Sequence, residues 1–113
     1  MSLDVYLSTP ACPTCGRNDE LFHANITHNL SEMAGELGIY PALWCPEAVN
    51  VTCAADLIVP LTAAIEKMQA DPEHWQSYDS PNGWGLAVNF LPWLVRYRAA
   101  CLEHPKSVVT ANR

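Results

Sequence analysis

Residues 21–27, LFHANIT, decide the fold together with residues 3–8, LDVYLS. Apolar and polar side chains alternate in both stretches, which is the pattern of a half-buried β-strand. The segment between them, TPACPTCGRNDE, is rich in Pro, Gly, Asn and Asp and therefore predicts a loop. Two neighbouring strands joined by one loop pair most simply as an antiparallel hairpin, so we predict a hairpin of residues 3–8 with residues 21–27.

The alternation also restricts the register of this hairpin, because side chains of the same kind must face each other across the pair. Two registers, shifted by two residues, satisfy this condition. In the one with the shorter loop, one face carries apolar pairs: Leu7 with Phe22, Val5 with Ala24, and Leu3 with Ile26. The other face collects hydrogen-bonding groups: Asp4 opposite Asn25, and Tyr6 opposite His23.

A helix is expected directly after the hairpin. Thr27 or Asn29 can cap its N-terminus, and Gly38 is a natural residue at its C-terminal end. A packed aromatic connector of residues 39–46 follows, because Pro41 cannot continue the helix. The apolar stripe that identifies this helix consists of Leu30, Met33, Ala34 and Leu37.

Two further helices are expected in the second half of the chain. Thr52 is the predicted cap of the first of them, in which Pro60 indicates a kink or two abutting helices. Asp71 is the predicted cap of a short turn, and Asn89 that of the last helix, which ends at His104. The two stripes are Leu57, Ile58, Leu61, Ile65 and Met68, and then Phe90, Leu94, Tyr97 and Cys101.

These elements predict an α+β fold in which a two-stranded antiparallel hairpin packs on about three helices. Helices must cover the apolar face, because a two-stranded sheet is marginal alone. The length of 113 residues corresponds to one domain, residues 1–113. Residues 10–20 form a loop, and residues 106–113, which show no periodicity, are expected to be a frayed tail.

The composition excludes several classes of function. Twelve acidic residues against six basic ones give a net charge of −6, which argues against nucleic-acid binding and against a polybasic membrane surface. The apolar runs are too short to span a bilayer, and the first ten residues lack the basic segment of a signal peptide. We therefore expect a cytoplasmic protein.

Cys12-Pro-Thr-Cys15-Gly has the spacing of one half of a tetrahedral zinc site. A closed site needs two more ligands, and the candidates are Cys45 with Cys53, or His23. The alternative is a reduced loop with two exposed thiols or a labile disulfide. A thioredoxin-like role fits less well, because that motif lies between a strand and a helix. We predict a zinc site of Cys12, Cys15, Cys45 and Cys53.

Residues 25–29, Asn-Ile-Thr-His-Asn, gather amide, hydroxyl and imidazole groups where the second strand meets the first helix. Such donors bind anions without net positive charge, although the same residue types also serve as helix caps. Aromatic rings near them would stack on a nucleobase. The predicted ligand-binding set is Asp4, Tyr6, Asn25, Thr27, His28, Asn29, Trp44 and Trp84.

The order of these motifs resembles a family of small, uncharacterised phage and bacterial proteins. The resemblance covers nearly all of residues 3–104 and includes Leu43-Trp44 and Pro46. Its most specific parts are residues 25–29 and Asn82-Gly83-Trp84-Gly85. The Cys-Pro-x-Cys-Gly segment looks like an optional loop of some members. The resemblance implies a phage or mobile-element setting and no particular mechanism.

This chain departs from the family pattern at two positions. Cys45 stands where the pattern has Arg after Leu-Trp, and Cys53 stands where it tends to have a basic residue after Thr. If those basic residues contact a ligand in relatives, the resemblance says less about binding here. If the paired change supplies ligands to Cys12 and Cys15, it favours zinc.

Three classes of function remain. The first is a non-enzymatic phage-type accessory protein that binds a small polar or nucleotide-like ligand, such as a sponge for a defence signal. The second is an acidic interaction module that inhibits a host defence complex, or a zinc-stabilised structural domain. A small metal-dependent enzyme ranks last, because the sequence contains no recognisable catalytic motif.

Overall fold

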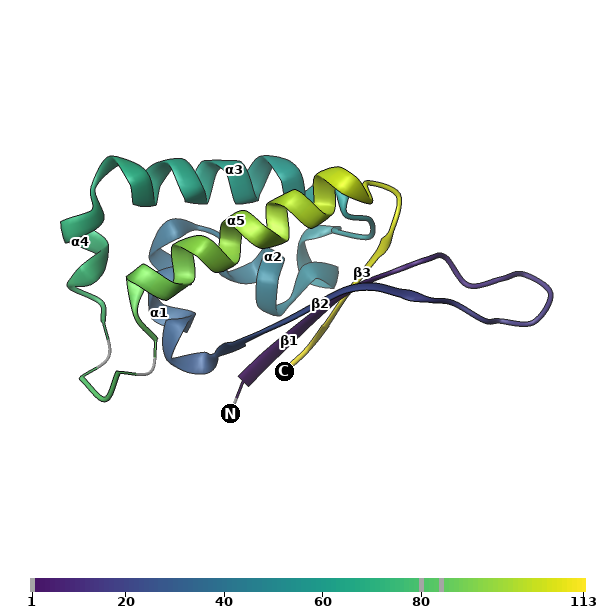
Figure 1. The fold of residues 1–113 in the computed structure, drawn as a ribbon, viewed down its shortest axis with the longest axis horizontal. Helices are drawn as coiled ribbons and strands as arrows, with labels where there is room; N and C mark the ends of the chain where they lie inside the picture. The colour runs from purple at the N-terminus through teal and green to yellow at the C-terminus, as the bar shows by residue number, and fades with distance from the viewer. Residues whose placement is uncertain (1, 80, 84) are drawn as a thin grey trace.

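A computed structural model describes residues 2–79, 81–83 and 85–113. The prediction made for Trp84 therefore lies outside the described residues. Three strands and five α-helices are present in the described part of the chain (Figure 1). Their order is β1 Ser2–Ser8, β2 Glu20–Thr27, 3-10 helix η1 His28–Leu30, α1 Ser31–Leu37, α2 Tyr40–Trp44, 3-10 helix η2 Pro46–Val49, α3 Ala55–Ala70, α4 Pro72–Gln76, α5 Ala87–Glu103 and β3 Val108–Asn112.

The predicted hairpin is confirmed, and of the two registers that the alternation allows it has the one with the shorter loop. β1 and β2 pair antiparallel with Leu3 opposite Ile26, Asp4 opposite Asn25 and Leu7 opposite Phe22, and an irregularity follows Leu7. Beyond the paired residues, the β1–β2 loop projects well past the helices (Figure 1). We call residues 9–19 the arm. At its base, the N–H of Thr9 donates to Asp19 O at 2.8 Å and the N–H of Asp19 donates to Thr9 Oγ1 at 2.8 Å.

The prediction of a frayed tail is wrong, because the last residues form a third strand. β3 pairs antiparallel with β1, and the strand order is β2-β1-β3. Val109, opposite Leu7, is 8% exposed and belongs to the core. Its N–H also donates to Thr52 O at 3.1 Å, which ties the strand to the segment before α3. Five residues are too few to show a periodicity, and their partner lies a hundred residues away.

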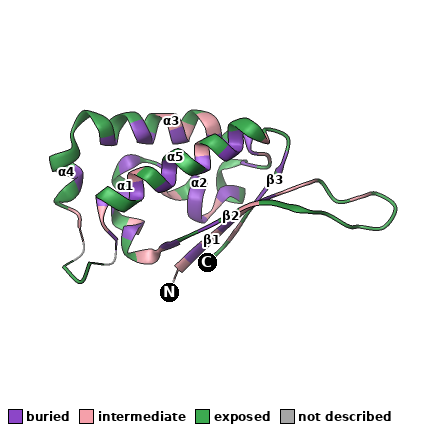
Figure 2. Ribbon diagram, viewed as in Figure 1, coloured by how far each residue is buried: buried purple, intermediate pink, exposed green. Residues whose placement is uncertain are grey.

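The helices cover one face of the sheet, and their inward sides form the core with it (Figure 2). Leu3, Val5 and Leu7 of β1 are fully buried, as the alternation requires. Tyr97 and Phe90 of α5 are the largest of the core side chains that are fully buried. The connector of residues 39–46 contains a short helix, α2. Pro41 lies in the first turn of α2, where a proline is well tolerated, and it also prevents α1 from continuing.

Several helix ends follow from local sequence, and others do not. Thr27 caps η1, Gly38 ends α1 with φ 79°, and Asp71 caps α4. The expected caps Thr52 and Asn89 are wrong. α3 begins at Ala55 without a side-chain cap, and it runs as one helix through Pro60.

Aspartate carboxylates at other positions accept hydrogen bonds from backbone N–H groups at the starts of α3 and α5. Asp56 in the first turn of α3 accepts from the N–H groups of Thr52 and Cys53, which lowers the pKa of its carboxyl. α5 begins at Ala87, whose N–H donates to Asp79 Oδ1 at 2.7 Å. Within the described residues, no helix is long and apolar enough to cross a membrane.

Candidate functional site

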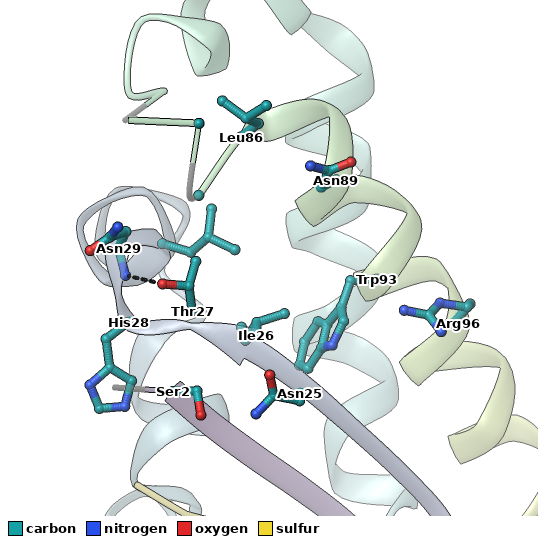
Figure 3. Close-up of a pocket in the computed structure, with 13 residues that line it drawn as sticks. Ser2, Asn25, Ile26, Thr27, His28, Asn29, Leu86, Asn89, Trp93 and Arg96 are labelled. Carbon is teal, nitrogen blue, oxygen red and sulfur yellow. Dashed lines mark hydrogen bonds between the residues drawn. The ribbon is translucent and has the colours of Figure 1, made fainter. Parts of the chain in front are cut away.

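A cleft with a volume of about 1090 Å³ lies between the end of β2 and the N-terminal half of α5 (Figure 3). One wall comes from β2, η1 and Ser2, the other from α5 and the turn before it. The described residues that line the cleft are Ser2, Asn25, Ile26, Thr27, His28, Asn29, Leu30, Gly83, Gly85, Leu86, Asn89, Trp93 and Arg96.

The first wall contains the polar cluster that the sequence analysis identified. Asn25, Thr27, His28 and Asn29 all line the cleft. Thr27 Oγ1 accepts from the N–H of Asn29 at 3.3 Å, which turns the chain from the strand into η1. Thr27 therefore caps η1 and also lines the cleft. A role of this cluster in helix capping is compatible with a role in ligand binding.

The turn before α5 is held against this wall by a glycine. Gly85 has φ +98°, a left-handed conformation that other residues adopt with strain. A Cβ atom at this position would lie 2.9 Å from Asn29 Cβ and 3.2 Å from its carbonyl carbon. Gly85 therefore allows the backbone of the turn to pack directly on Asn29, which closes this end of the cleft.

The second wall was not identified from the sequence. Asn89, Trp93 and Arg96 lie at spacings of four and three residues, so that they share one side of α5. Trp93 is 2% exposed and Arg96 is exposed. The spacing of these three residues can be read from the sequence. They form a wall of the cleft only because α5 packs next to β2.

The charges of the cleft differ from those of the whole chain. Although the protein has a net charge of −6, the described lining residues include one arginine and no carboxylate. Arg96 forms no hydrogen bond or ion pair with any described residue. By contrast, Arg98 donates from Nε to Thr62 Oγ1 at 2.6 Å, and Arg113 donates to Trp44 O at 3.1 Å. The cleft thus presents an unpaired cation in a strongly acidic protein.

Two buried nitrogen atoms at the cleft have no acceptor among the described residues. They are Trp93 Nε1 and His28 Nε2. Buried polar groups are normally hydrogen-bonded, so such atoms mark places where a water molecule or a ligand completes the structure. The His28 ring also lies edge-on to Trp44, with ring centroids 6.1 Å apart.

Asp4 and Tyr6 lie on the open face of the sheet, next to the cleft. Asp4 Oδ1 is 2.9 Å from His23 Nε2 and accepts from Asn25 Nδ2 at 3.0 Å. The hydrogen bonds from His23 and Asn25 lower the pKa of the Asp4 carboxyl. Tyr6 stacks on His23, with ring centroids 4.7 Å apart. These contacts orient Asn25, while Asp4 and Tyr6 themselves do not line the cleft.

The structure places Trp44 in the core. It is 2% exposed, stacks on Tyr40 and does not line the cleft. α2 turns this side chain toward the interior together with Leu43, which is fully buried. Trp44 therefore packs against the His28 ring, and neither of its ring faces is free to stack on a ligand.

The four cysteines of the predicted zinc site lie in two regions. Cys12 and Cys15 are in the arm. Cys45 and Cys53 are in the rest of the molecule outside the arm, which we call the body. Cys45 Sγ lies 2.9 Å from Arg113 Nη1, and Cys53 Sγ donates to Asp56 at 3.6 Å. Within the described residues, no group of three or more His, Cys, Asp or Glu side chains is arranged to hold a metal ion. The structure therefore does not bring the four sulfur atoms together.

Comparisons with models of known protein families, with curated proteins and with solved structures found no match to this chain. The candidate site therefore rests on the geometry of the cleft.

Proposed function

We propose that this chain is a non-enzymatic binding protein that holds a small nucleotide-like anion in the cleft between β2 and α5. The observation that carries the proposal is the unpaired Arg96 in a cleft without a carboxylate among its described lining residues. A guanidinium left free at a cleft is suited to a phosphate or carboxylate group, which it binds with two parallel hydrogen bonds.

The remaining lining residues suit a ligand that is polar with a smaller apolar part. Leu86 is half-buried and supplies apolar surface, and the amides of Asn25 and Asn89 offer donors and acceptors. Ile26, Leu30 and Trp93 also line the cleft, but they are 7%, 2% and 2% exposed and offer a ligand little area. A volume of about 1090 Å³ is close to the upper end of the usual range for small-molecule sites, roughly 300–1,000 Å³. Amide, guanidinium and indole groups recognise ligands and are not nucleophiles. The lining also contains the hydroxyls of Ser2 and Thr27 and the imidazole of His28, but no hydrogen bond within the described residues joins either hydroxyl to this imidazole, which favours binding over catalysis.

The experiment is calorimetric titration with mononucleotides and cyclic nucleotides, each compared with its nucleoside. We expect the phosphate-bearing compounds to bind and the nucleosides to bind at least tenfold more weakly. Arg96→Ala should weaken nucleotide binding roughly ten- to hundredfold, because a hydrogen bond to a charged group contributes about 1.5–3 kcal/mol.

Lys106→Ala is the matched control. Lys106 is also an exposed cation with no partner among the described residues, but it lies beyond the C-terminal end of α5 and does not line the cleft. Its removal should leave the affinity unchanged. Equal losses in both variants would indicate a general charge effect, and an unchanged affinity in Arg96→Ala would contradict the proposal.

A second candidate is the acidic interaction module. Val88, Val95 and Leu102 recur every seven residues on α5 and are 58%, 44% and 50% exposed. An exposed apolar stripe on an acidic protein suits a basic helix with one apolar face. If no nucleotide binds, this candidate leads, and Val95→Asp should weaken binding of such a peptide. Unchanged peptide binding would remove it.

A further inference from the structure

The tip of the arm holds two cysteines in a tight turn. Gly16 N–H donates to Cys12 O at 2.7 Å, and Cys12 N–H donates to Arg17 O at 2.8 Å, so that residues 12–17 form a closed loop. Gly16 has φ +73°, which this turn requires. Both thiols are free, with Cys15 exposed and Cys12 half-exposed. The turn therefore presents two sulfur atoms to solvent in one small, ordered unit.

The spacing and the backbone of this turn suit a metal ion. Two cysteines separated by two residues and followed by a glycine form half of a tetrahedral zinc site, because the glycine lets the backbone fold around the sulfur atoms. Here Gly16 has the positive φ, and the backbone bonds of Cys12 to Gly16 and Arg17 close the turn. The turn thus offers two thiol ligands for one metal ion.

The other half does not come from the described residues of the same chain. No third His, Cys, Asp or Glu there completes a metal-binding group with Cys12 and Cys15. Cys45 is engaged by Arg113 and Cys53 by Asp56, both in the body. The molecule measures 50 × 27 × 22 Å, and the arm projects along its long direction, away from the body (Figure 1). The tip is thus accessible from outside and remote from the other cysteines.

We propose that the arm tips of two copies of this chain share one zinc ion, held by Cys12 and Cys15 of each copy. Four thiolates then complete the tetrahedral site, and the protons of the four thiols are released to solvent as the ion binds. The complex of Zn²⁺ with four thiolates carries two negative charges. Arg17 directly follows each turn and is 81% exposed, so that it offsets part of this charge.

The long, thin arm is suited to such a contact. Two tips can meet end to end while the two bodies, each with a net charge of −6, stay apart. A two-fold axis through the metal would make the contact self-complementary and would close it at two copies. This site is independent of the cleft between β2 and α5, so that either proposal can fail alone.

The test is native mass spectrometry and size-exclusion chromatography of the full chain, under a non-thiol reductant, with and without added Zn²⁺. We expect a monomer without metal and a dimer with one zinc ion per two chains. Co²⁺ in place of Zn²⁺ should give the absorption spectrum of a tetrahedral site with four thiolates.

The cysteine variants separate the possible ligand sets. Cys12→Ser and Cys15→Ser should each abolish the zinc-dependent dimer, whereas the double variant Cys45→Ser/Cys53→Ser should form it as the native chain does. A monomer that binds one zinc ion per chain, and loses it in the double variant, would overturn the proposal in favour of four cysteines from one chain. Absence of zinc binding, or a dimer without metal, would also overturn it.

Discussion

Gly85 shows how one residue determines the shape of the cleft. Its positive φ and its contact with the backbone of Asn29 are two separate requirements for glycine at the same position. The pattern Asn82-Gly83-Trp84-Gly85 suggests a tight turn from sequence alone. The contact with Asn29 is what makes this turn the end of the cleft, because it joins the segment before α5 to the start of η1.

Gly85→Ala should destabilise the protein by about 1–3 kcal/mol, because the added Cβ strains the backbone and collides with Asn29. Gly35→Ala is the control. Gly35 lies on an exposed position of α1, and a Cβ there meets nothing within 4 Å, so this variant should be roughly 0.5–1 kcal/mol more stable. Chemical denaturation measures both changes. A Gly85→Ala variant as stable as the native protein would contradict the contact described here.

β3 shows what a single element adds to the sheet. Without it, the edge of β1 would present unpaired N–H and C=O groups on the side opposite β2. With it, β1 is the central strand, which explains why its alternate residues are fully buried. The strand also links the sheet to the segment before α3, through the bridge between Cys53 and Val108.

Two adjacent valines in β3 test this role. Val109 points into the core at 8% exposure, whereas Val108 is 36% exposed. Val109→Ala should cost roughly 1–3 kcal/mol of unfolding free energy, because it removes buried apolar surface. Val108→Ala should change it by about 0.5 kcal/mol or less. Thermal or urea unfolding compares the two, and similar values for both would indicate that the segment is not packed as a strand.

At the scale of the whole molecule, the body and the arm have separate roles. The body contains the core and the cleft, and the arm beyond Thr9 and Asp19 is mostly exposed. The described core contains no residue of the arm. The proposed nucleotide site lies in the body, and the proposed zinc site lies in the arm.

Replacing residues 10–18 by Asn-Gly tests this separation. The pair Thr9 and Asp19 already has one of the two backbone hydrogen bonds that flank a two-residue hairpin turn, from Thr9 N–H to Asp19 O, while the Asp19 N–H donates to Thr9 Oγ1. The shortened chain should differ in stability by roughly 1 kcal/mol or less and should bind nucleotides with unchanged affinity, but it should no longer dimerise with zinc. Circular dichroism melting, calorimetry and chromatography give the three readings. Loss of folding in the shortened chain would show that the arm is part of the structural core.

The sequence by itself determined the hairpin and the caps at Thr27, Gly38 and Asp71, and it limited the hairpin to two registers. All of these depend on interactions between near neighbours, or on a strict alternation that allows few pairings. It also gathered Asn25, Thr27, His28 and Asn29 in one place, because they are consecutive or nearly so along the chain.

Only the tertiary structure decided the rest. β3 pairs with a strand a hundred residues away, Asp79 caps α5 from across a turn, and Arg96 reaches the cleft because α5 packs against β2. No local propensity specifies these contacts, since they arise when apolar faces from distant segments are buried together. The polar half of the cleft was therefore visible in the sequence, whereas its cationic and aromatic half appeared only on folding.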